Sequence, residues 1–269
     1  MNRRLTLCRE RDQEILLTYL KKDPVRNTFL IGDILNYGFD SEIQSVWADF
    51  EYKECKAVYL WFCNNLLIYS EEEKLYEDSM EAILLMKKPS QVMAKKSHLE
   101  QMQPYLESFS IHSKDLFALN NRKKETKTRY QYKVATNQDA NRIYDFLQSG
   151  ELAPLYAAKE MVEKRIETGE GVHYFMEEEG QIVAHINSAA ATPYSVMIGG
   201  LFTRAEDRGK GYASFLVEEL SKRLVEEGKT PCLISNHLSE NNLFLALGFD
   251  RIGEFTTLEP KEKYLGGAG

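Results

Sequence analysis

The segment from Ile198 to Leu220, IGGLFTRAEDRGKGYASFLVEEL, constrains the fold more than any other part of the chain. An apolar run comes first, a charged turn with two glycines follows, and an amphipathic helix begins where the glycines end. Gly209 and Gly211 let the backbone curl so that successive N–H groups face one ligand. The first helical turn adds unpaired N–H groups and the positive end of its dipole. The pattern predicts an anion-binding cradle for a phosphate or pyrophosphate.

Two other phosphate-binding motifs do not fit this segment. Ser214 stands where the third glycine of G-x-G-x-x-G would fall, and the chain has no G-x-x-x-x-G-K-S/T pattern. Short glycine patterns also occur at ordinary solvated turns between a strand and a helix, so the flanking sequence has to decide.

The composition indicates a globular protein of two domains. The chain has 269 residues, of which 43% are hydrophobic and 28% are charged. No apolar run approaches the roughly eighteen residues that span a bilayer. Charged residues at the N-terminus come before any apolar stretch like that of a signal peptide, so we expect a cytoplasmic protein without a membrane partner. Four cysteines without C-x-x-C spacing predict reduced, mostly buried thiols and no metal site.

The net charge of −7 lies entirely in the second half, where 14 basic and 21 acidic residues follow Tyr130. A nucleic-acid binder usually carries the opposite sign on its working domain, so we expect no DNA or RNA partner. An acidic surface favours a cationic binding partner such as an amine, although acidic residues also serve to keep a protein soluble.

A polar, charged run at residues 120–129 separates two patterned regions and predicts domains over 1–120 and 130–269 with a linker at 121–129. The first half is expected to be α/β with antiparallel strands and without a phosphate loop. Its predicted helices are 11–20, 29–35, 75–86 and 104–109, and its predicted strands are 45–50, 55–62 and 65–69.

The predicted strands and helices follow a different order in the second half. Gly199-Gly200 inside one of its strands predicts a bulge or a close approach by a ligand. Its predicted strands are 130–135, 173–177, 182–189, 194–203, 231–235 and 249–258, and its predicted helices are 137–147, 159–166, 213–227 and 239–247.

The spacing Arg208-x-x-Gly211-x-Ala213 resembles the R/Q-x-x-G-x-G/A signature of the GNAT superfamily of acyl-CoA-dependent N-acyltransferases. Ser235 to Phe249, SNHLSENNLFLALGF, is similar to the N-x-x-S-N-x-L-Y-x-K-x-G-F ending of many GNAT domains. The predicted order β-α-α-β-β-β-α-β-α-β is also the family's. The resemblance covers Tyr130 to about Pro260 and implies an α/β protein with a mixed sheet and the GNAT fold in its C-terminal half. The whole chain resembles a two-domain bacterial member whose first half is a degenerate GNAT-like domain.

The resemblance implies acetyl-CoA as the cofactor, held partly by the strand that ends at Thr203. That strand is expected to splay from the strand at 231–235, which leaves main-chain groups free to bond the amides of the pantetheine arm. Asn236 and Asn241 are expected to contact the arm, although capping or turn formation explains these asparagines as well. The implied cofactor contacts are Leu201, Phe202, Thr203, Arg208, Gly209, Lys210, Gly211, Tyr212, Ala213, Ser214, Asn236, Asn241 and Phe244.

The catalytic groups are less defined. Phe244 stands where the family often has a tyrosine that protonates the departing thiolate, and a phenyl ring has no proton to give. Tyr212 and Ser239 are substitute donors. By element placement alone, Glu151, His173 and His185 are candidate bases, against the alternatives of surface or core residues and of a water chain. Tyr156 is the predicted residue of the acceptor pocket.

We therefore expect an N-acetyltransferase that moves acetyl from acetyl-CoA to a primary amine, on a small molecule or a peptide, by direct attack in a ternary complex. Phe244 and the lack of a carboxylate on the strand 194–203 support a second hypothesis, a non-catalytic acyl-CoA-binding or sensor protein. A third hypothesis makes the first half an interaction or dimerisation module. The sequence leaves monomer and homodimer open.

Overall fold

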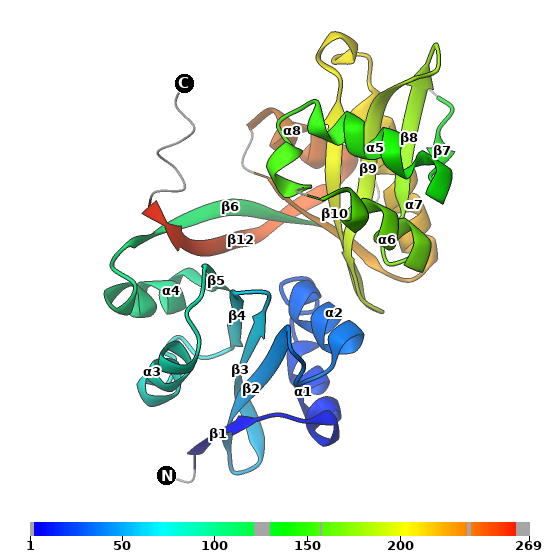
Figure 1. Cartoon of the computed structure of the whole chain (residues 1–269). Coiled ribbons are helices and arrows are strands. Elements are labelled where there is room, and N and C mark those ends of the chain that lie inside the picture. The colour runs from blue at the N-terminus through cyan, green and yellow to red at the C-terminus, as the bar shows by residue number, and fades with distance from the viewer. Residues whose placement is uncertain (1–2, 121–129, 157, 236–237, 262–269) are drawn as a thin grey trace. The chain divides into compact units, whose positions relative to one another are not determined.

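The computed structural model describes residues 3–120, 130–156, 158–235 and 238–261, and the chain divides into two compact units (Figure 1). Unit 1 contains residues 1–115 and 253–269, and unit 2 contains residues 116–252.

This division differs from the contiguous domains that the sequence predicts. Residues 253–260 belong to unit 1, and residues 116–119 belong to unit 2. The predicted linker, 121–129, lies outside the described residues. Each unit is therefore completed by a strand segment from the other half of the sequence.

Unit 1 contains a sheet with an antiparallel meander. β1 to β4 pair in sequence, β4 then pairs with β5 in parallel, and the end of β12 runs antiparallel to β5, with Thr256 opposite Ala94. The elements are β1 (Arg3–Leu7), α1 (Gln13–Leu20), α2 (Thr28–Tyr37), β2 (Gln44–Glu51), β3 (Glu54–Phe62), β4 (Asn65–Ser70), α3 (Glu77–Met86), β5 (Gln91–Ala94), α4 (Lys96–Met102), the start of β6 (Phe109–Leu119) and the end of β12 (Phe249–Pro260).

Unit 2 has the strand order β6-β11-β10-β9-β8-β7, in which β10 and β11 are parallel and β7 to β10 form an antiparallel meander. Its elements after β6 are β7 (Lys133–Val134), α5 (Ala140–Gln148), α6 (Lys159–Thr168), β8 (His173–Glu178), β9 (Gln181–Ala191), β10 (Ser195–Thr203), α7 (Tyr212–Glu226), β11 (Thr230–Ser235), α8 (Leu238–Leu247) and the start of β12.

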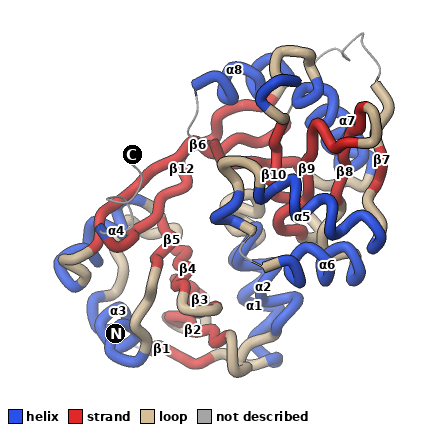
Figure 2. The backbone as a smooth tube through the Cα atoms, turned by 45° about the horizontal axis from the view of Figure 1, so that its top comes forward, coloured by secondary structure: helices blue, strands red, loops and turns tan. Residues whose placement is uncertain are grey.

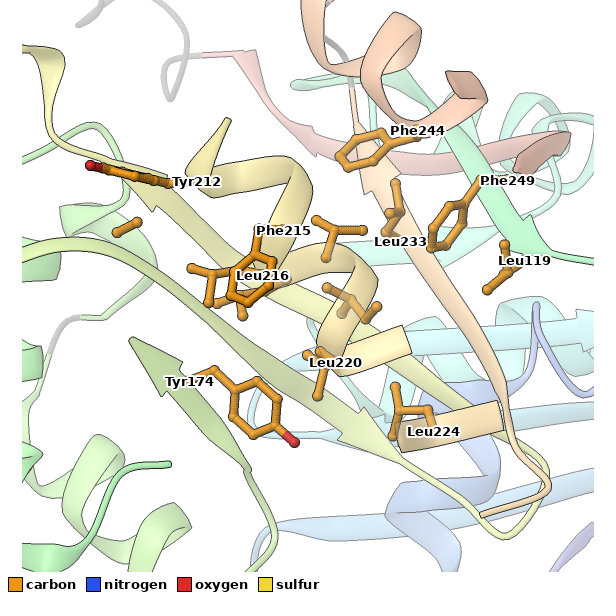
Figure 3. Packing of buried hydrophobic residues seen from close by; sticks show 14 of the residues in the cluster. Leu119, Tyr174, Tyr212, Phe215, Leu216, Leu220, Leu224, Leu233, Phe244 and Phe249 are labelled. Carbon is orange, nitrogen blue, oxygen red and sulfur yellow. The ribbon is translucent and has the colours of Figure 1, made fainter. Parts of the chain in front are cut away.

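Helices cover both faces of the sheet of unit 2. α5 and α6 lie in front of β8 to β10 in Figure 1 and α7 lies behind them, and Figure 2 shows the strands in red between these helices. On α7, Leu216 and Leu220 are wholly buried in the cluster drawn in Figure 3. Their four-residue spacing puts both on one face, and burying each contributes about 1.5–3 kcal/mol. Ile143 and Val162 pack against Phe175 on the other face.

The predicted element order of the second half is confirmed, with small shifts at the ends. The helix predicted at 104–109 is wrong: a short 3₁₀ turn covers Gln103–Tyr105, and β6 begins at Phe109. The strand predicted at 130–135 is reduced to Lys133–Val134. β6 was not predicted as a strand, and β1, β5 and α4 were not predicted because they are short and lack clear periodicity. All four cysteines are free thiols, and only Cys63 is exposed.

Candidate cofactor site and active site

Strand β10 separates from β11 partway along its length. Their parallel register runs from Ser195, opposite Thr230, to Ile198, opposite Leu233, and ends there although both strands continue. The splay predicted between these strands is confirmed. It leaves the second half of β10 with a free edge at which a peptide-like arm can bond.

A bulge on the other edge of β10 marks the point of separation. Gly200 and Leu201 lie between two register pairs, where β9 offers the single residue Ile186. Gly200 has a φ of +60°, and a Cβ there would lie 2.4 Å from Asn187 Oδ1 and 2.6 Å from the Tyr156 hydroxyl oxygen. Only glycine satisfies both the left-handed backbone and the missing space.

The loop after β10 forms the predicted cradle. Gly209 and Gly211 have φ values of +79° and +92°, and Gly211 is the N-cap of α7. A Cβ at Gly209 would meet nothing within 4 Å, and one at Gly211 would meet only the Tyr130 hydroxyl, at 3.9 Å. The first N–H groups of α7, from Tyr212 to Ser214, have no intrahelical acceptor. The concave backbone and the helix end fit a pyrophosphate group.

Charged side chains stiffen this loop from within. The buried carboxylate of Asp207 accepts hydrogen bonds from Lys210 Nζ at 2.6 Å and from Arg204 Nε at 2.5 Å, and these bonds hold the pKa of Asp207 below its usual range. Lys210 Nζ also lies 3.4 Å from Glu178. The Lys210 carbonyl accepts from the Tyr130 hydroxyl at 2.6 Å. Lys210 therefore holds the shape of the loop through both its side chain and its carbonyl.

Arg208 is an exposed cation beside the cradle. Its Nε donates to the Thr203 carbonyl at 3.2 Å, and its Nη2 lies 3.6 Å from the Glu151 carboxylate. Both side chains are largely exposed. Glu151, one of the candidate bases, is thus paired with the arginine that the resemblance assigns to the pyrophosphate.

Tyr156, the predicted residue of the acceptor pocket, lies at the bulge. Its hydroxyl donates to Asn187 Oδ1 at 3.1 Å, and its ring is buried in a cluster with Phe202. Burial raises the pKa of the Tyr156 hydroxyl. Asn187 Nδ2 is buried without a partner among the described residues. The sequence signal for Asn187, an amide inside the apolar run IVAHIN, was missed.

His173 and His185 form a buried pair that does not fit the role of a base. His185 Nδ1 is 2.8 Å from the Gly200 carbonyl oxygen, and its Nε2 is 2.9 Å from His173 Nδ1. Burial lowers the pKa of His185 to about 4, and burial together with the neighbouring His185 lowers that of His173 further. Both nitrogens of His185 are occupied, so it has no lone pair to offer an acceptor amine.

Phe244, at the usual acid position, and the substitute donor Tyr212 both have other contacts. Phe244 is buried in the apolar cluster, where Figure 3 shows it with Phe249, and its ring lies 5.9 Å from that of Phe117 and 6.0 Å from that of Phe249. The Tyr212 hydroxyl donates to Glu178, which raises the pKa of Tyr212. Asn241 and Ser239 fall on α8, and Asn236 lies outside the described residues.

The corresponding loop of unit 1, between β4 and α3, is built differently. It contains no glycine and carries Glu71, Glu72 and Glu73. Their carbonyl oxygens accept from Lys95 Nζ at 3.1 Å, from His98 Nε2 at 2.8 Å and from Gln101 Nε2 at 3.0 Å, respectively. The loop is therefore tied to α4 and to the residue before it by the chain's own side chains. Its acidic surface would repel a phosphate.

No group of three or more His, Cys, Asp or Glu side chains among the described residues is placed to hold a metal ion. No helix in this part of the chain is long and apolar enough to cross a membrane.

Comparison with known proteins agrees with this geometry. The family model described as FR47-like protein matches residues 176–257, a segment that includes the bulge, the cradle and α8. No curated protein matches the sequence.

Several solved structures share the fold over most of the chain. A GNAT-family acetyltransferase from Colwellia psychrerythraea is 14% identical with a TM-score of 0.58, covering 96% of this chain and 100% of its own. A GCN5-related N-acetyltransferase-like protein from Streptococcus suis is 12% identical with a TM-score of 0.60, covering 93% and 98%. A tandem GNAT protein from the clavulanic acid biosynthesis pathway is 10% identical with a TM-score of 0.60, covering 96% and 98%.

Proposed function

We propose that the chain is a member of the GNAT superfamily and that unit 2 transfers an acetyl group from acetyl-CoA to a primary amine in a ternary complex. The observation that carries the proposal is the continuity of three features along one segment. The bulge at Gly200, the edge of β10 freed by the splay, and the glycine cradle at the start of α7 follow one another within fifteen residues, Gly200 to Ser214.

Different residues of this segment bind different parts of acetyl-CoA. The N–H groups from Gly209 to Ser214 and the guanidinium of Arg208 bind the pyrophosphate, and the free edge of β10 binds the amides of the arm. Tyr156 borders the acceptor. Acetyl-CoA supplies a thioester: the amine forms the new C–N bond, the C–S bond breaks, and the proton lost by the amine and the proton gained by the thiolate are exchanged with solvent.

No side-chain acid is needed at Phe244. A thiol has a pKa of about 8.5, so its thiolate is a fair leaving group without a proton donor. Catalysis then depends on positioning and on a backbone N–H that polarises the thioester carbonyl.

The cradle is tested by calorimetry of CoA binding to the full chain. Gly209→Ala and Gly211→Ala place a Cβ in the cradle, and we expect each to weaken binding at least about tenfold. The matched control is Gly228→Ala, because Gly228 has a φ of +74° with nothing within 4 Å of its Cβ position and lies at the far end of α7. It carries the same backbone strain, about 1–2 kcal/mol, without touching the cradle. Equal affinities in all four proteins would refute the cradle.

A holding protein for acyl-CoA is the second candidate, and the observation that favours it is Phe244 itself, buried at the usual acid position. Thiol release from acetyl-CoA, measured with polyamines, amino acids, aminoglycosides and peptide N-termini, separates the two. Turnover with any amine supports the transferase. Tight acetyl-CoA binding without turnover on the whole panel supports the holding protein.

A further inference from the structure

The hydrogen bonds of the buried histidine pair fix which ring nitrogens carry protons. The Gly200 carbonyl oxygen only accepts, so His185 Nδ1 carries a hydrogen and donates to it. In the neutral ring His185 Nε2 is then an acceptor, and His173 Nδ1 donates to it. His173 Nε2 is left as a buried acceptor with no partner among the described residues. The chain of donors runs in one direction and ends on the bulge.

The ladder between β9 and β10 sets the direction of the main chain after the bulge. Arg204 N donates to Val183 O at 3.0 Å, and the antiparallel register places Phe202, two residues earlier, on the same hydrogen-bonding edge. The residue before Phe202 lies at the alternate position, so the N–H of Leu201 faces away from β9. β11 has already separated on that side.

The peptide bond between Gly200 and Leu201 gives the same answer independently. The described residues contain no cis peptide bond, and in a trans peptide the C=O and the following N–H point in opposite directions. His185 holds the Gly200 carbonyl on its own side of the strand. The Leu201 N–H then points away from His185, which agrees with the direction that the β9–β10 ladder gives.

We propose that His185, supported by His173, is a positioning residue that locks the Gly200–Leu201 peptide so that the Leu201 N–H points at the thioester carbonyl of bound acetyl-CoA. This inference rests on the proposed function and adds to it the residues that orient the hydrogen-bond donor. Gly200 has a glycine's freedom to rotate, so its peptide needs a fixed partner. Wholly buried and hydrogen-bonded at both ring nitrogens, His185 is that partner.

The test measures the thioester directly, without an amine. Acetyl-CoA labelled with ¹³C at the carbonyl is bound to the full chain, and its carbonyl band is recorded by difference infrared spectroscopy. We expect the band to move to lower wavenumber on binding to the wild type, because a hydrogen bond weakens the C=O bond. His185→Leu removes the donor to Gly200 and should lose most of the shift. His185→Asn keeps an N–H near the position of Nδ1 and should retain it.

Binding and turnover supply the second readout. CoA affinity should stay within about threefold of wild type in both variants, because the cradle is untouched. In the presence of an accepted amine, kcat should fall at least about tenfold in His185→Leu and recover in His185→Asn. For comparison, removing an oxyanion donor altogether lowers kcat by about 10²- to 10³-fold. His98→Leu is the matched control, since His98 is a wholly buried histidine of unit 1 that bonds one carbonyl. It should leave the carbonyl band unchanged.

The outcomes separate this inference from the proposed function. If the wild type does not bind acetyl-CoA, the proposed function fails and the inference with it. If the wild type binds acetyl-CoA without a band shift, or if His185→Leu keeps the full shift, the positioning role is refuted while the cofactor site stands. Should His185→Leu fail to fold, His173→Leu replaces it, because it removes only the support of His185 and should reduce the shift in part; an unreduced shift would contradict the support.

Discussion

The carboxylate of Glu151 lies 3.6 Å from the guanidinium that an incoming pyrophosphate would meet. Such an exposed pair is worth only about 0.2–1 kcal/mol, but it competes directly with the phosphate for Arg208. We expect Glu151→Gln to bind CoA about 1.5- to 5-fold more tightly by calorimetry at low salt. Glu163→Gln, which breaks the exposed pair with Lys159 on α6, is the control and should change nothing. Weaker binding in Glu151→Gln would mean that the glutamate supports the site.

Phe244 allows a prediction about stability. Phe244→Tyr places a hydroxyl in the buried apolar cluster that contains Phe117, Phe249 and Leu233. Burying an unpaired hydroxyl costs about 1–3 kcal/mol, and about 1 kcal/mol lowers the melting temperature of a chain of this size by about 2–4 °C. We expect a lower melting temperature with turnover no worse than wild type. A melting temperature equal to wild type would show that the new hydroxyl finds a hydrogen-bond partner, as the hydroxyl of a catalytic tyrosine would.

The histidine pair makes stability depend on pH. Unfolded histidines take up protons near pH 6.5, whereas burial lowers the pKa of folded His185 to about 4. The unfolded state therefore binds more protons between these values, so the stability of the wild type falls as pH drops through this window, by at most about 1.4 kcal/mol per pH unit for each histidine. His185→Asn should lose less stability from pH 7 to pH 4.5 than the wild type in urea unfolding. Parallel curves would contradict the assigned pKa.

At the scale of elements, the two units repeat one order of strands and helices. β1 to β6 follow the same β-α-α-β-β-β-α-β-α-β sequence as β7 to β12. The amino-acid sequence shows no repeat, because the pattern of apolar positions that forms such elements can be filled by nearly any apolar residue. What differs is the loop after the fourth strand: glycines at an open helix end in unit 2, and glutamates tied to α4 in unit 1.

Sequence reasoning found the elements whose signals are local. The cradle was predicted because its glycines, charged turn and helix start lie within a few residues. The carbonyl of Gly200, by contrast, bonds His185 of β9, and His185 in turn bonds His173 of β8. Such contacts depend on strand register, which cannot be read from the sequence. The sequence therefore suggests His185 as a candidate base, whereas in the structure His185 bonds the Gly200 carbonyl at the bulge.

At the scale of the whole molecule, each unit uses a strand segment from the other half of the sequence. Thr256 and Leu258 of β12 pair with β5 in unit 1, and Phe117 and Leu119 of β6 are buried in the core of unit 2. The composition of 120–129 marks a polar segment, but it carries no information about which strands pair. Domain limits drawn from that segment alone therefore differ from the compact units.

This sharing predicts how the protein responds to being cut. A chain of residues 1–120 lacks the β12 strand of unit 1, and a chain of residues 121–269 lacks Phe117 and Leu119, where losing one buried Phe costs about 3–5 kcal/mol. We expect neither half alone to show a cooperative thermal transition by circular dichroism, and co-expression of both halves to restore one. Cooperative melting of either isolated half would contradict the sharing.

We propose that the splay and cradle of unit 2 form the acyl-CoA site, and a crystal structure of the full chain grown with acetyl-CoA is the decisive test. We predict one bound molecule per chain, with its pyrophosphate on the N–H groups from Gly209 to Ser214, its arm along the edge of β10, and its carbonyl oxygen within hydrogen-bond distance of Leu201 N. Acetyl-CoA bound at the β4–α3 loop of unit 1, or bound in unit 2 away from β10 and the cradle, would contradict the claim.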